Sequence, residues 1–289
     1  MSGEGRAAGR QPSELALRVV SALVLIAAVL TATWYGGRLF AVICAAVSVL
    51  VLIEYLQIAR LAVSTGTTGL AFAALGIVLL SWFGASGEHA LAALVLGLLF
   101  LALFEGVSRR SAWSAGGLAY AALPFFALVL IRGDEPVGLH AVFLVFACVW
   151  GADTLAYFAG RAIGGPKLAP RISPKKTWAG FFGGIAGSVI AASAVLALSG
   201  YALSALALAL MVVLSIVSQI GDLLESWIKR RFGKKDSGKI IPGHGGMLDR
   251  IDGLITAGVA AWLIGGFVSG QPLVPGAAAR GLFAAFILP

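Results

Sequence analysis

Residues 202–222 read ALSALALALMVVLSIVSQIGD, an apolar run that ends in a single carboxylate. An α-helix needs about 20 consecutive apolar residues to cross the hydrocarbon core of a bilayer. Within lipid a segment must satisfy its own backbone hydrogen bonds, which a helix does and an isolated strand does not. The run therefore predicts a transmembrane helix, with Asp222 at its end.

Runs of this kind fill most of the chain. Of its 289 residues, 60% are hydrophobic and 12% are charged, whereas a soluble domain carries about 25% charged residues. We expect an all-α, polytopic integral membrane protein with about nine transmembrane helices. The predicted spans lie near 17–35, 40–58, 66–84, 89–106, 113–131, 139–158, 178–199, 202–222 and 253–269.

The expected domain organisation is simple. Residues 1–14 are rich in Gly, Ala, Arg and Ser and predict a disordered cytoplasmic tail. Residues 15–270 form a single membrane domain. Residues 271–289 are expected to form a C-terminal tail, whose apolar part, 281–288, is too short to cross a bilayer.

The distribution of Lys and Arg predicts the orientation. With the N-terminus in the cytoplasm, eighteen of the 21 fall in inside segments, and only Arg38, Arg132 and Arg280 fall outside. Cytoplasmic loops of membrane proteins carry such an excess of positive charge. We therefore expect a multi-pass protein of the cytoplasmic (inner) membrane, with two long cytoplasmic loops, 159–177 and 223–252, that can meet to build one site. The same bias accounts for the net charge of +8 without a nucleic-acid partner.

The longer loop concentrates charge. Ser226 to Asp252 reads SWIKRRFGKKDSGKIIPGHGGMLDRID, with seven cationic residues and three acids. Lys and Arg bind phosphates, and successive backbone N–H groups near glycines form nests for anions. His244, among the glycines, can donate to a phosphate oxygen or move a proton. The alternative is that the cations are only the basic flank of a transmembrane helix.

Two acids stand one helical turn apart at the start of the last span. Asp249 and Asp252, together with Asp222, form a carboxylate set of the kind that binds Mg²⁺. The alternative is that the pair complements the dipole of the helix that follows. Arg250 lies between them, where it can clamp a phosphate or pair with a carboxylate.

The shorter loop carries a second polar pattern. Asp153 and Tyr157 share one helical face near the end of their span, and the segment from Ser173 to Trp178 reads SPKKTW. Thr177 can cap the next helix, and a helix N-terminus beside lysines makes an anion site. A basic cytoplasmic loop without further function is again the alternative. Three other polar residues near span ends, Glu54, Glu105 and His140, have no motif around them and are interpreted as interfacial or packing groups.

These motifs resemble the signature of the phosphatidate cytidylyltransferases, also called CDP-diacylglycerol synthases. In the longer loop the resemblance is carried by Ser226, Ile228, Lys229, Arg230, Lys235, Asp236, Gly238, Pro242, His244, Gly245, Gly246, Asp249, Arg250 and Asp252. Upstream it is carried by Asp153, Ala156, Tyr157 and the segment Ser173 to Trp178. One position departs from the pattern: Ala179 stands where the family usually has Glu.

The resemblance implies a reaction in which CTP and phosphatidate give CDP-diacylglycerol and pyrophosphate. It implies Mg²⁺ as the cofactor, with a second monovalent or divalent cation as an open alternative, and a homodimer in the membrane lipid. Two other functions stay open. A CTP-dependent polyprenol kinase would release CDP in place of pyrophosphate. A transporter of anionic substrates would share the spans and basic loops, but it does not need the Asp, His and Gly cluster.

The residues and the resemblance together assign the site. Catalytic roles are expected for Asp222, Lys229, Lys235, Asp236, His244, Asp249 and Arg250. Substrate contacts are expected for Asp153, Tyr157, Ser173, Lys175, Lys176, Thr177, Ser226, Arg230, Gly245 and Gly246. The expected metal ligands are Asp222, Asp249 and Asp252.

Overall fold

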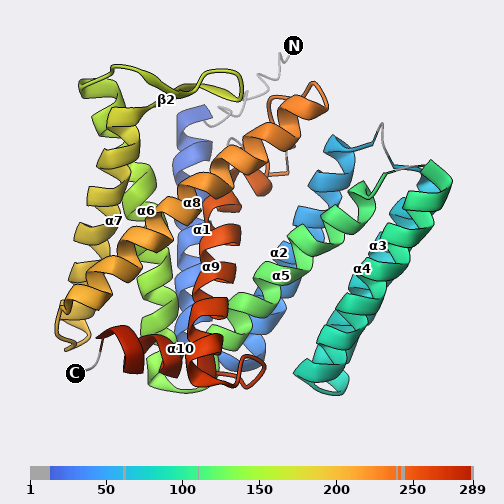
Figure 1. Cartoon of the computed structure of the whole chain (residues 1–289), viewed down its shortest axis with the longest axis horizontal. Helices are drawn as coiled ribbons and strands as arrows, with labels where there is room; N and C mark the ends of the chain where they lie inside the picture. The colour runs from blue at the N-terminus through green and yellow to red at the C-terminus, as the bar shows by residue number, and fades with distance from the viewer. Residues whose placement is uncertain (1–13, 61–62, 110, 239, 242–244, 288–289) are drawn as a thin grey trace, which may run out of the picture.

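The chain folds as a bundle of long helices (Figure 1). The computed structural model describes residues 14–60, 63–109, 111–238, 240–241 and 245–287. Its long helices are α1 (Glu14–Tyr35), α2 (Gly37–Ile58), α3 (Thr65–Gly84), α4 (Gly87–Arg109), α5 (Trp113–Arg132), α6 (Pro136–Ala162), α7 (Trp178–Leu198), α8 (Ala205–Arg231) and α9 (Leu248–Ser269). Two short strands, β1 (Lys167–Ala169) and β2 (Ser173–Thr177), precede α7, and α10 (Ala277–Leu282) with a π-helical turn, η1 (Phe283–Ile287), ends the described chain.

Eight of the described helices, α2 to α9, are long and apolar enough to cross a membrane. They coincide with eight of the predicted spans. Helix α1 occupies the place of the first predicted span, and its apolar part from Val20 to Tyr35 is shorter than the others. The prediction of an all-helical, polytopic membrane protein is therefore confirmed, with one small β-hairpin added to it. Of the predicted disordered tail, residues 1–13 lie outside the described residues.

Both predicted cytoplasmic loops are shorter than expected. Helix α8 continues through the charged residues to Arg231, and α9 begins at Leu248, so the loop between them is 232–247 rather than 223–252. Cations complement the negative end of a helix dipole, so Lys229, Arg230 and Arg231 extend α8. With 27 residues, α8 is about 40 Å long, which exceeds the roughly 30 Å hydrocarbon core.

The other loop begins only after α6 ends at Ala162, and it contains the hairpin. Strands β1 and β2 are antiparallel, with Lys167 opposite Thr177 and Ala169 opposite Ser173. Proline disfavours helix interiors, and Pro166, Pro170 and Pro174 are spread through this segment. The hairpin therefore forms where a plain loop was expected.

Close contact between α6 and α7 places the hairpin against the bundle. A Cβ atom added to Gly151 would lie 2.4 Å from the carbonyl oxygen of Gly187, so only glycine fits at this crossing. Small residues allow helix backbones in membranes to approach in this way. The C-terminal segment packs similarly, because a Cβ atom on Gly265 would lie 2.0 Å from the carbonyl oxygen of Ala278 in α10. The segment expected to be a tail therefore folds against α9.

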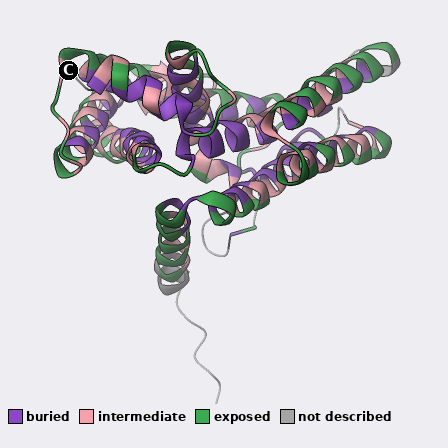
Figure 2. Cartoon of the chain, turned by 90° about the horizontal axis from the view of Figure 1, so that it is seen from below, coloured by how far each residue is buried: buried purple, intermediate pink, exposed green. Residues whose placement is uncertain are grey.

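The remaining helices are arranged around this core. Figure 1 shows α6 to α9 grouped together, α2 and α5 beside them, and α3 with α4 as a hairpin at the edge. Figure 2 shows exposed residues along most of α1, which stands apart from the bundle. Large apolar side chains such as Leu23, Leu80 and Leu103 are exposed on α1, α3 and α4, as expected for surfaces that face lipid.

Candidate active site

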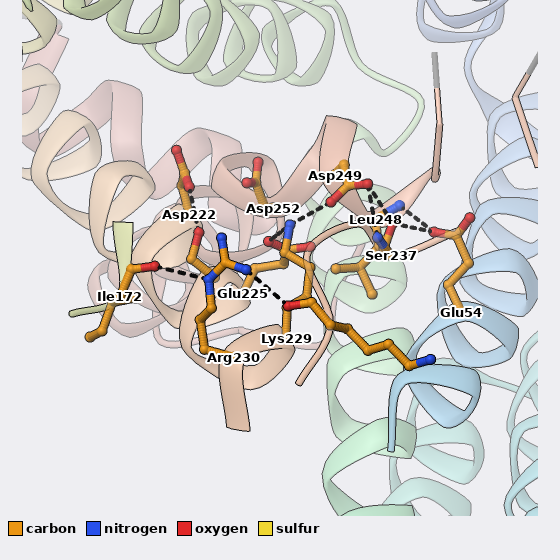
Figure 3. Close-up of polar contacts among 12 residues, drawn as sticks. Glu54, Ile172, Asp222, Glu225, Lys229, Arg230, Ser237, Leu248, Asp249 and Asp252 are labelled. Carbon is orange, nitrogen blue, oxygen red and sulfur yellow. Dashed lines mark hydrogen bonds and ion pairs between the residues drawn. The ribbon is translucent and has the colours of Figure 1, made fainter. Parts of the chain in front are cut away.

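The two predicted cytoplasmic segments are joined by direct contacts. The Nζ atom of Lys176, in β2, lies 2.5 Å from Oδ2 of Asp222, in α8. The Nε atom of Arg230, near the end of α8, donates to the carbonyl oxygen of Ile172 over 3.4 Å (Figure 3). The expectation that these segments meet is confirmed, and the hairpin lies over the charged end of α8.

Lys229 is held between two carboxylates. Its Nζ atom lies 2.6 Å from Oε2 of Glu225, one turn earlier in α8, and 2.5 Å from Oδ1 of Asp249, in the first turn of α9. The Lys229 side chain is 12% exposed and that of Glu225 is 1% exposed. An ion pair in such surroundings is little screened by solvent, so the lysine ties α8 to the start of α9.

Asp249 is fully engaged within the protein. Its second oxygen, Oδ2, accepts hydrogen bonds from the backbone N–H of Ser237 over 3.1 Å and from the Ser237 hydroxyl over 2.8 Å. Oδ1 already faces Lys229. Sequence reasoning placed Asp249 in the metal set, whereas the structure shows it joining Lys229 to the loop between α8 and α9.

A different group of acids gathers around Lys176. The carboxylates of Asp153, Asp222 and Asp252 lie within electrostatic range of one another and of the Lys176 ammonium. Asp252 accepts a hydrogen bond from the backbone N–H of Gly253 over 2.8 Å, and Figure 3 places it beside Asp222. Three acids thus share one nearby lysine.

This donor set is chemically suited to Mg²⁺, which prefers carboxylate oxygens. Within the described residues, however, no three His, Cys, Asp or Glu side chains are arranged closely enough to hold a metal ion. The expected set of Asp222, Asp249 and Asp252 stays a prediction. In this structure Asp249 bonds Lys229 and Ser237.

The shorter loop leads directly into the N-terminus of α7. The hydroxyl oxygen of Thr177 accepts a hydrogen bond from the backbone N–H of Gly180 over 3.0 Å, which confirms the predicted cap of α7. Lys175 is exposed beside Lys176, and Ser173 is half-buried. Tyr157 turns outward, where its hydroxyl accepts from Nη1 of Arg161 over 2.8 Å.

Four other expected site residues, which the structure describes, are Ser226, Lys235, Asp236 and Arg250. Ser226 donates to Oδ1 of Asp222 over 3.5 Å. Lys235 and Asp236 are exposed in the loop after α8, and Arg250 is exposed in the first turn of α9.

The glycine turn closes the loop before α9. Gly245 adopts a positive φ of 88° and pairs with Ile241, while Gly246 is buried. His244, together with Pro242 and Gly243, lies outside the described residues.

The structure adds a residue that sequence reasoning left without a role. Glu54, in α2, is completely buried and accepts hydrogen bonds from Met247 N–H over 3.0 Å and from Leu248 N–H over 2.7 Å. The Ser237 hydroxyl lies 3.1 Å from Glu54, and its single proton is shared between Glu54 and Asp249. An acid inside an apolar run is costly and often functional, and that signal was present in the sequence. Glu105 and His140 fit their interpretation as packing groups, since they bond Ser114 and Tyr201 away from the charged cluster.

Comparison with known proteins places these features in a wider group. The sequence model of the cytidylyltransferase family matches residues 16–268. The chain is 43% identical over 272 residues to the phosphatidate cytidylyltransferase of Brucella suis biovar 1, which covers 92% of this chain and 98% of that protein. It is 36% identical over 273 residues to the phosphatidate cytidylyltransferase of Haemophilus influenzae, covering 83% of this chain and 94% of that protein.

Proposed function

This chain belongs to the cytidylyltransferase family, and from that premise we propose that it is a phosphatidate cytidylyltransferase. It transfers the cytidylyl group of CTP to phosphatidate, giving CDP-diacylglycerol and pyrophosphate. The observation that supports this most strongly is the meeting of Lys176, Asp222, Lys229 and Asp249 from three separate elements at one end of the membrane bundle.

The reaction is a displacement at phosphorus. A phosphate oxygen of phosphatidate attacks the α-phosphorus of CTP and forms a new P–O bond. The P–O bond to the β-phosphate breaks, and pyrophosphate leaves with the electron pair. The attacking phosphate is already anionic at neutral pH, so the step needs little proton transfer. Its main difficulty is electrostatic, because two polyanions must be brought together and aligned.

Two lysines of the site reduce this electrostatic repulsion. Lys176 and Lys229 are each paired with carboxylates before substrate binds, so their ammonium groups are already held in place. Phosphate oxygens can take up the remaining donors of each ammonium. Arg230 holds the hairpin against α8 through the Ile172 carbonyl, which keeps Lys176 in position. Lys175, Lys235 and Arg250 are exposed and are proposed to contact the incoming phosphates. The same role is proposed for His244, which lies outside the described residues.

The acids beside Lys176 have a separate role. Asp222 and Asp252 would hold the Mg²⁺ ion of the family reaction together with phosphate oxygens of the substrates, since Mg²⁺ commonly takes only one or two protein carboxylates. That ion, when bound, neutralises charge on phosphate oxygens. We assign Asp249 instead to orienting Lys229, because both of its oxygens are already bonded within the protein.

The site is proposed to face the cytoplasm, from a multi-pass protein of the inner membrane that forms a homodimer. The excess of Lys and Arg in the segments at this end supports the orientation, and CTP is a cytoplasmic substrate.

Labelled nucleotide tests the proposal. Purified protein is incubated with phosphatidate, Mg²⁺ and CTP that carries label at either the α- or the γ-phosphate. We expect α-label in the lipid product and γ-label in released pyrophosphate. If γ-label enters the lipid and CDP is released, the protein is a lipid kinase. A protein that moves no label into lipid under any of these conditions would contradict the proposal.

A further inference from the structure

Helix α9, which carries Asp249 and Asp252, begins without a cap of its own. Its N-cap residue is Met247, whose side chain makes no capping hydrogen bond. The first turn of a helix leaves backbone N–H groups without intrahelical acceptors. Methionine offers them no good acceptor, unlike the Ser, Thr, Asp or Asn preferred at this position. The start of α9 therefore depends on an acceptor from elsewhere in the chain.

Glu54 supplies that acceptor from α2. Its Oε1 accepts from Met247 N–H over 3.0 Å. Its Oε2 accepts from Leu248 N–H over 2.7 Å (Figure 3). The side chain is 0% exposed. A carboxylate at a helix N-terminus also interacts favourably with the helix dipole. Since the N–H groups satisfy the buried charge, this arrangement compensates for the cost of placing an acid among apolar residues.

The Glu54 carboxylate is also connected to the transfer site, the cluster of Lys176, Asp222, Lys229 and Asp249. The Ser237 hydroxyl lies 3.1 Å from Oε2 of Glu54 and 2.8 Å from Oδ2 of Asp249. Asp249 in turn faces Lys229. A continuous polar chain thus runs from α2, through the loop, to α9 and α8. Its last member, Lys229, is proposed to bind phosphate.

Two glycines of the loop make room for this carboxylate. A Cβ atom on Gly246 would lie 1.8 Å from the Ser237 hydroxyl oxygen and 2.8 Å from Oε2 of Glu54. A Cβ atom on Gly238 would lie 2.7 Å from Oε1 of Glu54. No side chain fits at either position while Glu54 keeps its place. The loop sequence is therefore matched to an acid that lies 193 residues before Met247.

We infer that Glu54 is a positioning residue of the transfer site, which fixes the start of α9 and, through Ser237, the orientation of Asp249 and Lys229. The effect on turnover rests on the proposed function, whereas the effect on the start of α9 does not. Glu54 is buried behind Ser237 and α9, so it acts through those groups and not by contact with substrate.

Glu54→Gln separates positioning from packing. Glutamine keeps the shape of the side chain, but its NH₂ group cannot accept, so either Met247 or Leu248 loses its acceptor. Changes to residues that orient a site typically cost about 10–100-fold in activity. We expect a fall in kcat of that size with little change in KM, because no substrate contact is removed. Ser237→Ala removes the hydroxyl between Glu54 and Asp249, but it keeps the cap and the backbone N–H bond to Asp249, so a smaller fall in kcat is expected.

The chain offers a matched control. Glu105 is also completely buried, and it accepts from the backbone N–H of Ser114 over 2.9 Å and from the Ser114 hydroxyl over 2.6 Å at the start of α5. Glu105→Gln therefore removes a buried, helix-capping charge that is not part of the polar chain. For all variants, kcat and KM are measured by transfer of label from CTP. Hydrogen–deuterium exchange is followed in peptides that cover 245–252.

The inference predicts faster exchange at Met247 and Leu248 and a lower kcat in Glu54→Gln, with neither effect in Glu105→Gln. It is overturned if Glu54→Gln keeps wild-type kcat and exchange. It is also overturned if the two Gln variants lose activity equally and in step with thermal stability, since that result marks a general packing role. If the wild-type protein transfers no label, the proposed function fails, while exchange at the start of α9 still decides the inference about the cap.

Discussion

Replacement of Lys229 by methionine tests whether its ion pairs serve structure, chemistry or both. The substitution keeps most of the side-chain volume and removes the ammonium group. Two acids then lose their partner: Glu225, whose side chain is 1% exposed, and Asp249, whose side chain is 18% exposed. Asp249 keeps its hydrogen bonds from Ser237. Glu225 keeps no described partner, because its other oxygen already has none.

The size of the effect follows from this burial. Removing one partner of a buried ion pair costs about 3–5 kcal/mol, because an uncompensated charge is left behind. We expect Lys229→Met to lower the unfolding free energy by an amount in this range and to abolish transfer. The double variant Glu225→Gln/Lys229→Met removes the uncompensated carboxylate as well. It should therefore recover a large part of the stability while remaining inactive, because the cation proposed to bind phosphate is still missing.

A double-mutant cycle measures both properties. Thermal unfolding in detergent is recorded for the wild type, both single variants and the double variant, and label transfer from CTP is measured for each. The critical comparison is between the Lys229→Met protein and the double variant. If activity returns together with stability in the double variant, Lys229 has only a structural role and its assignment to phosphate is refuted.

Three further results are expected. Lys176→Met should reduce transfer at least about tenfold, which corresponds to about 1.4 kcal/mol of barrier. Lys167→Met, on the other strand of the hairpin, should leave transfer nearly unchanged. Equal losses in the two variants would contradict the role of the Lys176–Asp222 pair. Ala179→Glu should change turnover less than about tenfold, because the residue lies in the first turn of α7 and phosphate charge is shared among several cations. An inactive wild type that is rescued by this substitution would refute the prediction. A cysteine at the exposed Lys235 should react with a membrane-impermeant reagent from the cytoplasmic side only, and one at the exposed Asp134 from the opposite side only; labelling of both from one side would contradict the proposed orientation.

Much of the fold could be predicted because membrane helices are a local property. Each span follows from a run of apolar residues long enough for the bilayer, and each helix satisfies its backbone within that run. Helix ends were less accurate. The charged residues Lys229 to Arg231 look like a loop by hydropathy, yet they continue α8 because cations stabilise a helix C-terminus. The hairpin was missed because it depends on the pairing of two short strands with each other. The packing of α10 was missed because it depends on contact with α9.

The candidate site, like the fold, could be predicted only in part from the sequence. The sequence by itself determined the kind of chemistry, since the spacing of Lys, Asp and Gly residues in two segments indicates phosphate binding and resembles one family. Only the tertiary structure decided which partners these residues take. Lys176 pairs with Asp222, Asp249 bonds Lys229 and Ser237, and Glu54 reaches the start of α9. Local patterning does not encode such pairings, because Glu54 and Leu248 are 194 residues apart and meet only when the packed helices place α2 beside the start of α9.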